Sequence, residues 1–253
     1  MVEQGRIDVF PKAGKRGSAF ASYTSGFESF VFLNYTNKFK DVLTLAHELG
    51  HATHGFLSQK QKSHVFESPL CLAETASIFN ETLISNKLKE KLSAKEKVKF
   101  LVEELDEIFA SIFRQVQYVS FEERVHQKYL DGEVLTSVEF SKIWREEVEK
   151  LTGGIVEFPF DEDVSWMRIH HLFHYPFYCF TYAFGNILSF SLYEKYVKGE
   201  LKVEEYKDIL RAGGSKEPKE LLSKYGIDIE SQKFYQDGLK RVEEMVNELK
   251  ELI

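Results

Sequence analysis

The segment His47–His51 reads His-Glu-Leu-Gly-His, and it constrains the fold of this chain more than any other feature. Side chains four residues apart lie on one face of an α-helix, so a helix through this segment would present both imidazoles to one point. Two imidazoles presented in this way can hold one metal ion, and the intervening Glu48 can accept a proton from a water molecule beside that ion. The pattern therefore predicts a helix that carries a metal site with a general base next to it.

The residues around this segment favour such a helix, which we expect over residues 40–58. Apolar residues recur there at the spacing of a buried helical stripe: Val42, Leu45, Ala46 and Leu49. Gly50 costs a helix about 1 kcal/mol relative to alanine, so its presence indicates the close approach of another backbone or of a ligand. The alternative is an exposed helix with two incidental histidines.

A third metal ligand is expected from another element, because a catalytic zinc usually has three protein ligands and one open position. Glu74 is the best candidate, since it follows His51 by 23 residues, a separation that suits a helix–loop–helix hairpin. A carboxylate in an apolar stretch of small residues also needs a partner. Glu81 is expected on the same face, where it could accept a hydrogen bond from a ligand histidine. His54 is a weaker candidate, for the surroundings or the wall of the site, and Glu74 could instead be an ordinary surface residue.

The composition argues against several other classes of protein. A formal net charge of −7 disfavours nucleic-acid binding, which needs a basic face. The two cysteines, Cys71 and Cys179, indicate no disulfide framework, and the N-terminus has no hydrophobic signal region, so we expect a cytoplasmic protein. Residues 172–193 lack charged side chains over a bilayer-spanning length, but their polar groups favour a buried, cleft-lining helix. A di-iron bundle would need Glu-x-x-His pairs on two helices, and the sequence offers no clear pair of them.

The periodicity of the remaining chain predicts a mainly α fold with a small N-terminal β element. Residues 5–36 are punctuated by glycines, and we expect short strands around 18–23 and 30–33. From about residue 40 onward the chain reads as helix. Further helices are expected over about 68–92 (opened by Ser68-Pro69), 95–130, 137–151 (behind a capping box at Thr136), 176–198, a segment ended by Gly213-Gly214, and 228–253.

Several segments together resemble the M3 family of zinc metallopeptidases, and its oligoendopeptidase F branch in particular. They are residues 47–54, 73–77, 5–9, 14–20, 171–178, 181–183, 212–215, 217–222 and 226–228. The resemblance covers nearly the whole chain and implies a helical, zincin-like catalytic domain over residues 1–253, with a deep channel that admits short peptides. It implies one Zn²⁺ per chain, bound by His47, His51 and Glu74, with Glu48 as the general base.

The resemblance also implies a role for the tyrosine-rich segment of the chain. His171, Tyr178 and Tyr182 would donate hydrogen bonds to the oxyanion of the tetrahedral intermediate, a task for which neutral O–H and N–H groups in a dry site are suited. Tyr175 is a further possibility, and each tyrosine could instead be a packed core residue. Phe180 departs from the tyrosine expected at its position in this branch.

The strand expected around Ser18–Tyr23 would, by the same resemblance, add the substrate backbone to its edge. Recognition through main-chain hydrogen bonds reads the peptide backbone more than its side chains. This mode of binding suits a broad range of short peptide substrates.

The length of the chain differs from that of the family. Its members are roughly twice as long and have a helical region before the catalytic part, so this chain would lack one wall of the channel and expose apolar surface. We therefore expect zinc binding with reduced or altered peptidase activity, unless self-association or a partner covers the open cleft. The predicted function is a zinc-dependent endopeptidase for short peptides, with no nucleic-acid or membrane partner. The alternatives are a non-catalytic zinc-containing peptide-binding or assembly module and a zinc carboxypeptidase.

Overall fold

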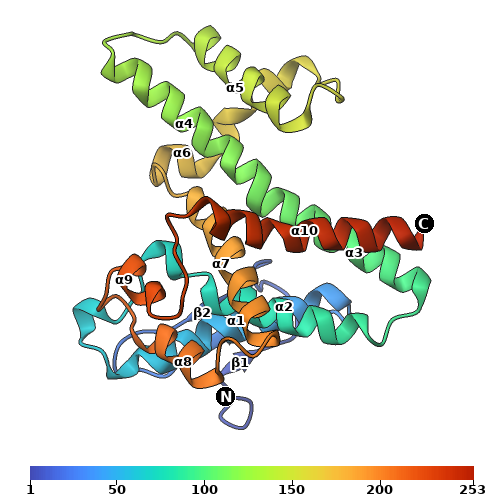
Figure 1. Cartoon of the computed structure of the whole chain (residues 1–253), viewed down its shortest axis with the longest axis vertical. Helices are drawn as coiled ribbons and strands as arrows, with labels where there is room; N and C mark the ends of the chain where they lie inside the picture. Colours follow the sequence, from blue (N-terminus) through green and yellow to red (C-terminus); the bar gives the residue numbers. More distant parts are fainter. The chain divides into compact units, whose positions relative to one another are not determined.

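The computed structural model of the chain describes residues 1–159 and 163–253 (Figure 1). The chain divides into two compact units. The first unit consists of residues Met1–Leu105 and Gly185–Ile253, and the second consists of residues Asp106–Phe184. The fold is mainly α with a small N-terminal sheet, which confirms the fold class predicted from the sequence.

The N-terminal sheet of the first unit is built from β1 (Ile7–Asp8), β2 (Phe20–Ser22) and β3 (Phe30–Phe32) in the order β1-β3-β2. β1 runs parallel to β3, and β2 runs antiparallel to it with Ala21 opposite Val31. Because β3 lies in the middle, β2 forms one edge of the sheet. The strands are close to those expected from the sequence.

Two helices pack along each other beside this sheet, α1 (Phe39–Leu57) and α2 (Thr75–Lys89) (Figure 1). α1 begins where the Asp41 carboxylate accepts hydrogen bonds from the backbone N–H groups of Thr36 and Lys38. The other elements that lie mostly in this unit are α3 (Ala94–Ile108), α7 (Phe180–Val197), α8 (Val203–Arg211), α9 (Pro218–Ser223), α10 (Gln232–Leu252), η1 (Ser58–Lys60), η2 (Ser63–Val65) and η3 (Leu70–Leu72).

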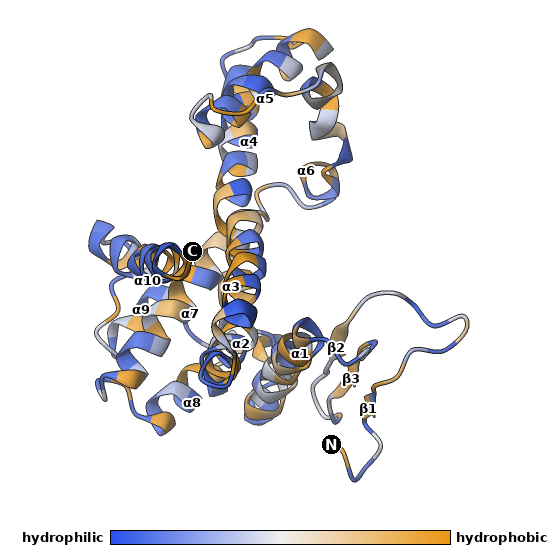
Figure 2. Cartoon of the chain, turned by 90° about the vertical axis from the view of Figure 1, so that its right-hand side faces the viewer, coloured by the Kyte–Doolittle hydropathy of each residue, from blue (hydrophilic) through white to orange (hydrophobic). Residues whose placement is uncertain are grey.

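The hydrophobic core of the first unit has one part between the sheet and α1 and another around α7. Val31 and Leu33 pack against Ala52 of α1. α7 is rich in hydrophobic residues, whereas α10 is largely hydrophilic (Figure 2). Four side chains of α7 illustrate its burial: Ile187, Leu188, Phe190 and Leu192. Within the described residues, no helix has both the length and the apolar character required to cross a membrane.

The second unit consists mainly of the helix pair α4 (Arg114–Leu130) and α5 (Ser137–Thr152), with the π-helical turn η4 (Phe109–Phe113), η5 (Phe160–Arg168) and α6 (His170–His174). α5 begins with the predicted capping box, in which Thr136 and Glu139 bond reciprocally, and it ends at Gly153 in the left-handed region (φ 62°). The core of this unit is formed by four buried residues: Phe121, Ile143, Trp144 and Val148.

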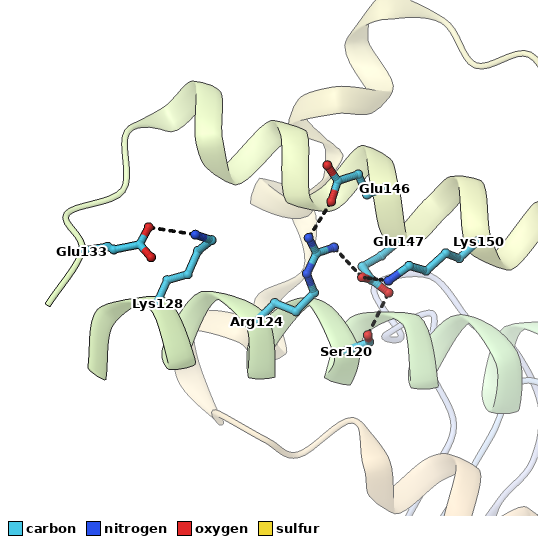
Figure 3. Close-up of polar contacts among 7 residues, drawn as sticks. All are labelled: Ser120, Arg124, Lys128, Glu133, Glu146, Glu147 and Lys150. Carbon is cyan, nitrogen blue, oxygen red and sulfur yellow. Dashed lines mark hydrogen bonds and ion pairs between the residues drawn. The ribbon is translucent and has the colours of Figure 1, made fainter. Parts of the chain in front are cut away.

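A polar network also joins α4 to α5, as Figure 3 shows. Glu147 is 4% exposed and accepts hydrogen bonds from Arg124 (2.6 Å), Ser120 (2.8 Å) and Lys150 (2.7 Å). Arg124 also pairs with Glu146. A buried carboxylate is stable only when its lone pairs are satisfied, and these three contacts satisfy those of Glu147.

Two helix starts predicted from the sequence were wrong. The helix expected from Ser68-Pro69 begins only at Thr75, because Pro69 is extended (ψ 145°) and precedes the separate turn η3. The helix expected from residue 176 begins at Phe180, because Phe177 has φ 58° and this left-handed conformation cannot be part of an α-helix.

Candidate active site

His47 and His51 lie one turn apart on α1, as the spacing of the sequence predicts. Their ring centroids are 4.9 Å apart at an interplanar angle of 77°. The His47 side chain is 28% exposed and the His51 side chain 15% exposed, so both are accessible from the surface of α1.

Glu74 meets both histidines from the start of α2. Its Oε2 atom lies 3.3 Å from Nε2 of His47 and 3.3 Å from Nε2 of His51. One ligand atom from each of these residues lies within 4.8 Å of the other two, and this is the group that could hold a metal ion among the described residues. The Ser77 hydroxyl donates to the same Glu74 oxygen at 2.7 Å and orients it. The structure thus brings the three predicted ligand residues together.

The chemistry of this donor set fits zinc. Two imidazole nitrogens and one carboxylate oxygen are typical ligands of a catalytic zinc with an open position. Nδ1 of His47 lies 3.1 Å from Oε2 of Glu81, and a carboxylate in that place orients a ligand imidazole. Nδ1 of His51 is buried and has no hydrogen-bond partner in the described part of the chain. Glu81 therefore makes the contact with the histidine pair that the sequence suggested.

The acidic neighbours of the histidines shift the pKa values of the group. Burial opposes protonation of His47, but its hydrogen bonds to Glu74 and Glu81 outweigh burial and raise its pKa to about 10. Burial acts to raise the pKa of Glu74, whereas the hydrogen bonds from His47 and His51 lower it overall. A divalent cation would replace the histidine protons as the positive charge on this carboxylate.

Glu48 lies between the two histidines in sequence and is 6% exposed. Burial raises the pKa of its carboxyl group, while the positive charges of His47 and His51 and an interaction with the Ala21 backbone oppose this rise. A carboxyl group whose pKa is moved toward neutrality can both accept a proton and return it. Its position and its raised pKa therefore suit a general base.

Two glycines allow this close packing. A Cβ atom added to Gly50 would lie 2.5 Å from the Cα atom of Ser77, so the close approach predicted at Gly50 is confirmed, and α2 supplies the approaching backbone. A Cβ atom added to Gly185 of α7 would lie 2.9 Å from the Glu74 Cβ atom. Neither Gly185 nor Ser77 was predicted from the sequence. For Ser77, the available signal was a hydroxyl three residues after a carboxylate at the start of a helix.

His54 does not join the group that could hold a metal ion. It is 4% exposed, and burial lowers the pKa of its imidazole to about 4. Its Nδ1 atom has no hydrogen-bond partner among the described residues. A buried, neutral imidazole at this position suits the wall of the site, the other role considered for it from the sequence.

The residues expected to stabilise an oxyanion form a cluster in the second unit. The Tyr182 hydroxyl lies 3.2 Å from Nε2 of His171. The Tyr178 ring stacks on the His171 ring at a centroid distance of 5.4 Å and an interplanar angle of 8°. Tyr175 is 66% exposed, and its ring centroid lies 6.2 Å from that of Tyr178. The structure therefore brings His171, Tyr178 and Tyr182 together as neighbouring hydrogen-bond donors.

A buried carboxylate that was not predicted from the sequence holds the turn before Tyr178. Glu122 of α4 is 3% exposed and accepts a hydrogen bond of 2.9 Å from the backbone N–H of Phe177. Phe177 has φ 58°, in the left-handed region that residues other than glycine rarely adopt. Its ring also packs against His126, at a centroid distance of 4.9 Å. Two side chains of α4 thus fix the backbone that carries Tyr178.

The edge strand β2 lies beside Glu48. The Ala21 backbone of β2 interacts with the Glu48 carboxyl group, and β2 pairs with β3 on one side. The sheet order places β2 at an edge, which is the position that the expected pairing with a peptide requires.

Comparison with known proteins agrees with the resemblance found in the sequence. The model of peptidase family M3 matches residues 1–241. The chromosomal oligoendopeptidase F of Lactococcus lactis subsp. cremoris is 34% identical over 250 residues, which are 98% of this chain and 41% of that protein. The chain therefore spans less than half the length of this curated relative.

Solved structures share the fold as well as the sequence. The crystal structure of a peptidase-like protein from Chlamydophila abortus matches with a TM-score of 0.87 and 35% identity, over 99% of this chain and 42% of that one. Oligoendopeptidase F from Enterococcus faecium matches with a TM-score of 0.74 and 31% identity, over 84% of this chain and 39% of that one.

Proposed function

Because the chain belongs to peptidase family M3, we propose that it is a zinc-dependent endopeptidase that hydrolyses short peptides. The observation that carries this proposal is the convergence of His47, His51 and Glu74 on one position, with Glu48 beside them. The relatives named oligoendopeptidase F support short peptides as the substrate class.

In this proposal, His47, His51 and Glu74 hold one zinc ion per chain. When bound, zinc supplies Lewis-acid chemistry, which lowers the pKa of water and polarises the peptide carbonyl. Glu81 fixes the orientation of the His47 ring through its hydrogen bond, and Ser77 fixes the Glu74 carboxylate. These two contacts keep the three ligand atoms in place before the metal arrives.

Glu48 acts as the general base in the proposed reaction. It takes the proton of the attacking water and delivers that proton to the leaving amine, a role that its burial and raised pKa support. His171, Tyr178 and Tyr182 donate hydrogen bonds to the oxyanion. Their clustering and the resemblance to the family support this assignment. The peptide backbone pairs with the edge of β2, supported by the place of this strand in the sheet.

The decisive experiment measures metal content and peptide turnover on the same sample, with and without a chelator. A quenched-fluorescent peptide of about ten residues reports turnover, and mass spectrometry locates the cuts. We expect about one zinc per chain, loss of turnover with the chelator and internal cuts. Glu48→Gln should keep the zinc and lower turnover by at least about 100-fold. Glu103→Gln, which changes an exposed glutamate of α3, is the matched control.

Other outcomes would select an alternative function. Peptide binding without cleavage by the zinc-loaded chain would favour a non-catalytic binding or assembly module. Removal of single residues from the peptide C-terminus would favour a carboxypeptidase. Turnover retained by Glu48→Gln would remove the proposed role of Glu48. Light scattering on the same sample tests whether a second copy of the chain covers exposed apolar surface.

A further inference from the structure

The first turn of α2 contacts α7 as well as α1, and the contacts with α7 take no part in the chemistry proposed above. Gly185 and Ser189 of α7 are four residues apart, so they share one face of that helix. Both belong to the first unit, and both meet the segment that carries Glu74. Because Glu74 is the candidate ligand that comes from outside α1, this face of α7 bears on the geometry of the metal site.

The stem of the Glu74 side chain packs against Gly185. A Cβ atom added to Gly185 would lie 2.9 Å from Cβ and 3.7 Å from Cγ of Glu74. The shorter distance leaves no room for a larger residue unless Glu74 or α7 shifts. Gly185 lies inside a helix, where glycine is among the least favoured residues. The close approach of Glu74 accounts for a glycine at this position.

Ser189 holds the backbone of the residue that follows Glu74. Its hydroxyl donates a hydrogen bond of 3.2 Å to the carbonyl oxygen of Thr75, the first residue of α2. Both Ser189 and Thr75 are 0% exposed. A hydrogen bond in so dry a place is stronger than one in water, because no solvent competes for the donor or the acceptor. The start of α2 is therefore tied to α7 directly beside the candidate ligand.

The opposite face of α7 is packed just as closely against α10. Ile187 lies two residues from both Gly185 and Ser189, which is about 200° around the helix. A Cβ atom added to Gly238 of α10 would lie 2.6 Å from Cγ2 of Ile187 and 3.1 Å from its carbonyl oxygen. Close packing on both faces leaves α7 little freedom to shift relative to α2.

We propose that Gly185 and Ser189 are positioning residues for the metal ligand Glu74, an inference that rests on the proposed function. Gly185 leaves room for the stem of the Glu74 side chain, and Ser189 anchors the backbone at Thr75. Together they hold the carboxylate where it meets the histidine pair of α1. Loss of either contact lets Glu74 shift and weakens the binding of the metal, because the affinity of a site depends on how well its ligands are held in place.

The test measures two properties of the metal-loaded full chain. Competition with a chromophoric chelator gives the affinity for Zn²⁺, and the visible absorption spectrum of bound Co²⁺ reports the ligand geometry. Ser189→Ala should weaken zinc binding about 3- to 10-fold, and Gly185→Ala should weaken it by at least about tenfold. Both should also alter the Co²⁺ bands. A role confined to stability would lower the resistance to urea and leave the affinity and the spectrum of the folded chain unaltered.

Ser191→Ala is the matched control, since it makes the same change two residues further along α7 while Ser189 keeps its bond to Thr75. It should bind zinc as the wild type does. If Gly185→Ala does not fold, Ser189→Ala carries the test alone. Absence of metal binding by the wild-type chain would overturn the proposed function and this inference with it. Metal binding by the wild type, with an equal affinity and an equal Co²⁺ spectrum in Ser189→Ala, would overturn this inference alone.

Discussion

The backbone of Gly50 in α1 lies against the backbone of Ser77 in α2, so closely that an added Cβ atom would sit 2.5 Å from the Ser77 Cα atom. The two residues are neighbours of the candidate metal site, since Gly50 lies beside His51 in sequence and Ser77 bonds to Glu74. The separation of α1 and α2 therefore determines the distance between the histidine pair and the carboxylate. Side-chain volume at Gly50 should affect stability and metal binding together.

Gly50→Ala should destabilise the chain by about 1–3 kcal/mol, because the added methyl group has no space and α1 must move away from α2. The gain in helix propensity, about 1 kcal/mol, offsets only part of this cost. Urea unfolding followed by circular dichroism measures the change, and a chelator competition measures the accompanying loss of zinc affinity. Gly17→Ala is the control, since an added Cβ there meets no atom within 4 Å. Equal stability of the two variants would contradict the close packing described here.

Ser77→Ala should weaken zinc binding by about tenfold while changing stability little. The Ser77 hydroxyl donates to the Glu74 carboxylate at 2.7 Å, and loss of such an orienting contact typically costs about 10- to 100-fold in metal affinity. Competition with a chromophoric chelator gives the affinity of each variant. Ser223→Ala serves as the control, because its exposed hydroxyl bonds to the Glu220 carbonyl, three residues earlier in its own helix. An unchanged zinc affinity in Ser77→Ala would mean that Glu74 is oriented without this hydroxyl.

Glu122→Ala should destabilise the turn at Phe177 by about 1–3 kcal/mol, because the Phe177 N–H loses its charged acceptor. Glu122→Gln keeps an acceptor oxygen and should retain most of the protection of this amide. Hydrogen exchange at the Phe177 amide is the direct measurement, with Glu123→Gln, its neighbour on α4, as the control. Equal protection of this amide in Glu122→Ala and the wild type would show that other contacts hold the turn.

The pH dependence of Glu122 provides a second readout. Burial raises the pKa of this carboxyl group in the folded chain, so the folded state binds more protons than the unfolded state above the ordinary pKa of a glutamate. The contribution of Glu122 to stability is therefore full at low pH and declines as the pH rises through the folded-state pKa. Glu122→Gln should remove this decline. A wild-type and a variant profile of the same slope would contradict the raised pKa.

The parts of the site that depend on one helix could be predicted from the sequence. His47, Glu48 and His51 follow from the 3.6-residue period, which is a local property of α1. The contact between Glu74 and the histidines was also predicted, but the local structure predicted for Glu74 was wrong. Glu74 lies at the N-cap of α2 and not inside a longer helix. The carboxylate reaches the same place because the α1–α2 packing, and not the first turn of a helix, sets its position.

The parts that depend on contacts between distant segments could not be predicted. The bond from Phe177 to Glu122 joins residues 55 positions apart, and no pattern in the sequence connects the two residues. The bond from Ser189 to the Thr75 carbonyl joins residues 114 positions apart, and it is a property of packing rather than of periodicity. The late start of α7 could not be predicted either, because the left-handed conformation of Phe177 depends on contacts with α4 and not on its residue type.

Glu147 provides a test of how the α4–α5 pair responds to acid, and the contacts involved are those of Figure 3. Burial acts to raise the pKa of Glu147, but the hydrogen bonds from Lys150, Ser120 and Arg124 outweigh it and lower the pKa. Between the lowered pKa and the ordinary value near 4.5, the unfolded chain binds more protons than the folded chain, so the stabilisation is complete above about pH 4.5 and lost below it. Glu147→Gln should therefore reduce the free energy of unfolding by about 1–3 kcal/mol at pH 7 and by progressively less as the pH falls.

Glu149→Gln changes an exposed glutamate of the same helix and should follow the wild type at each pH, as measured by urea unfolding. A constant difference between Glu147→Gln and the wild type from pH 7 to about pH 3 would show that the loss comes from packing rather than from the charge of this carboxylate.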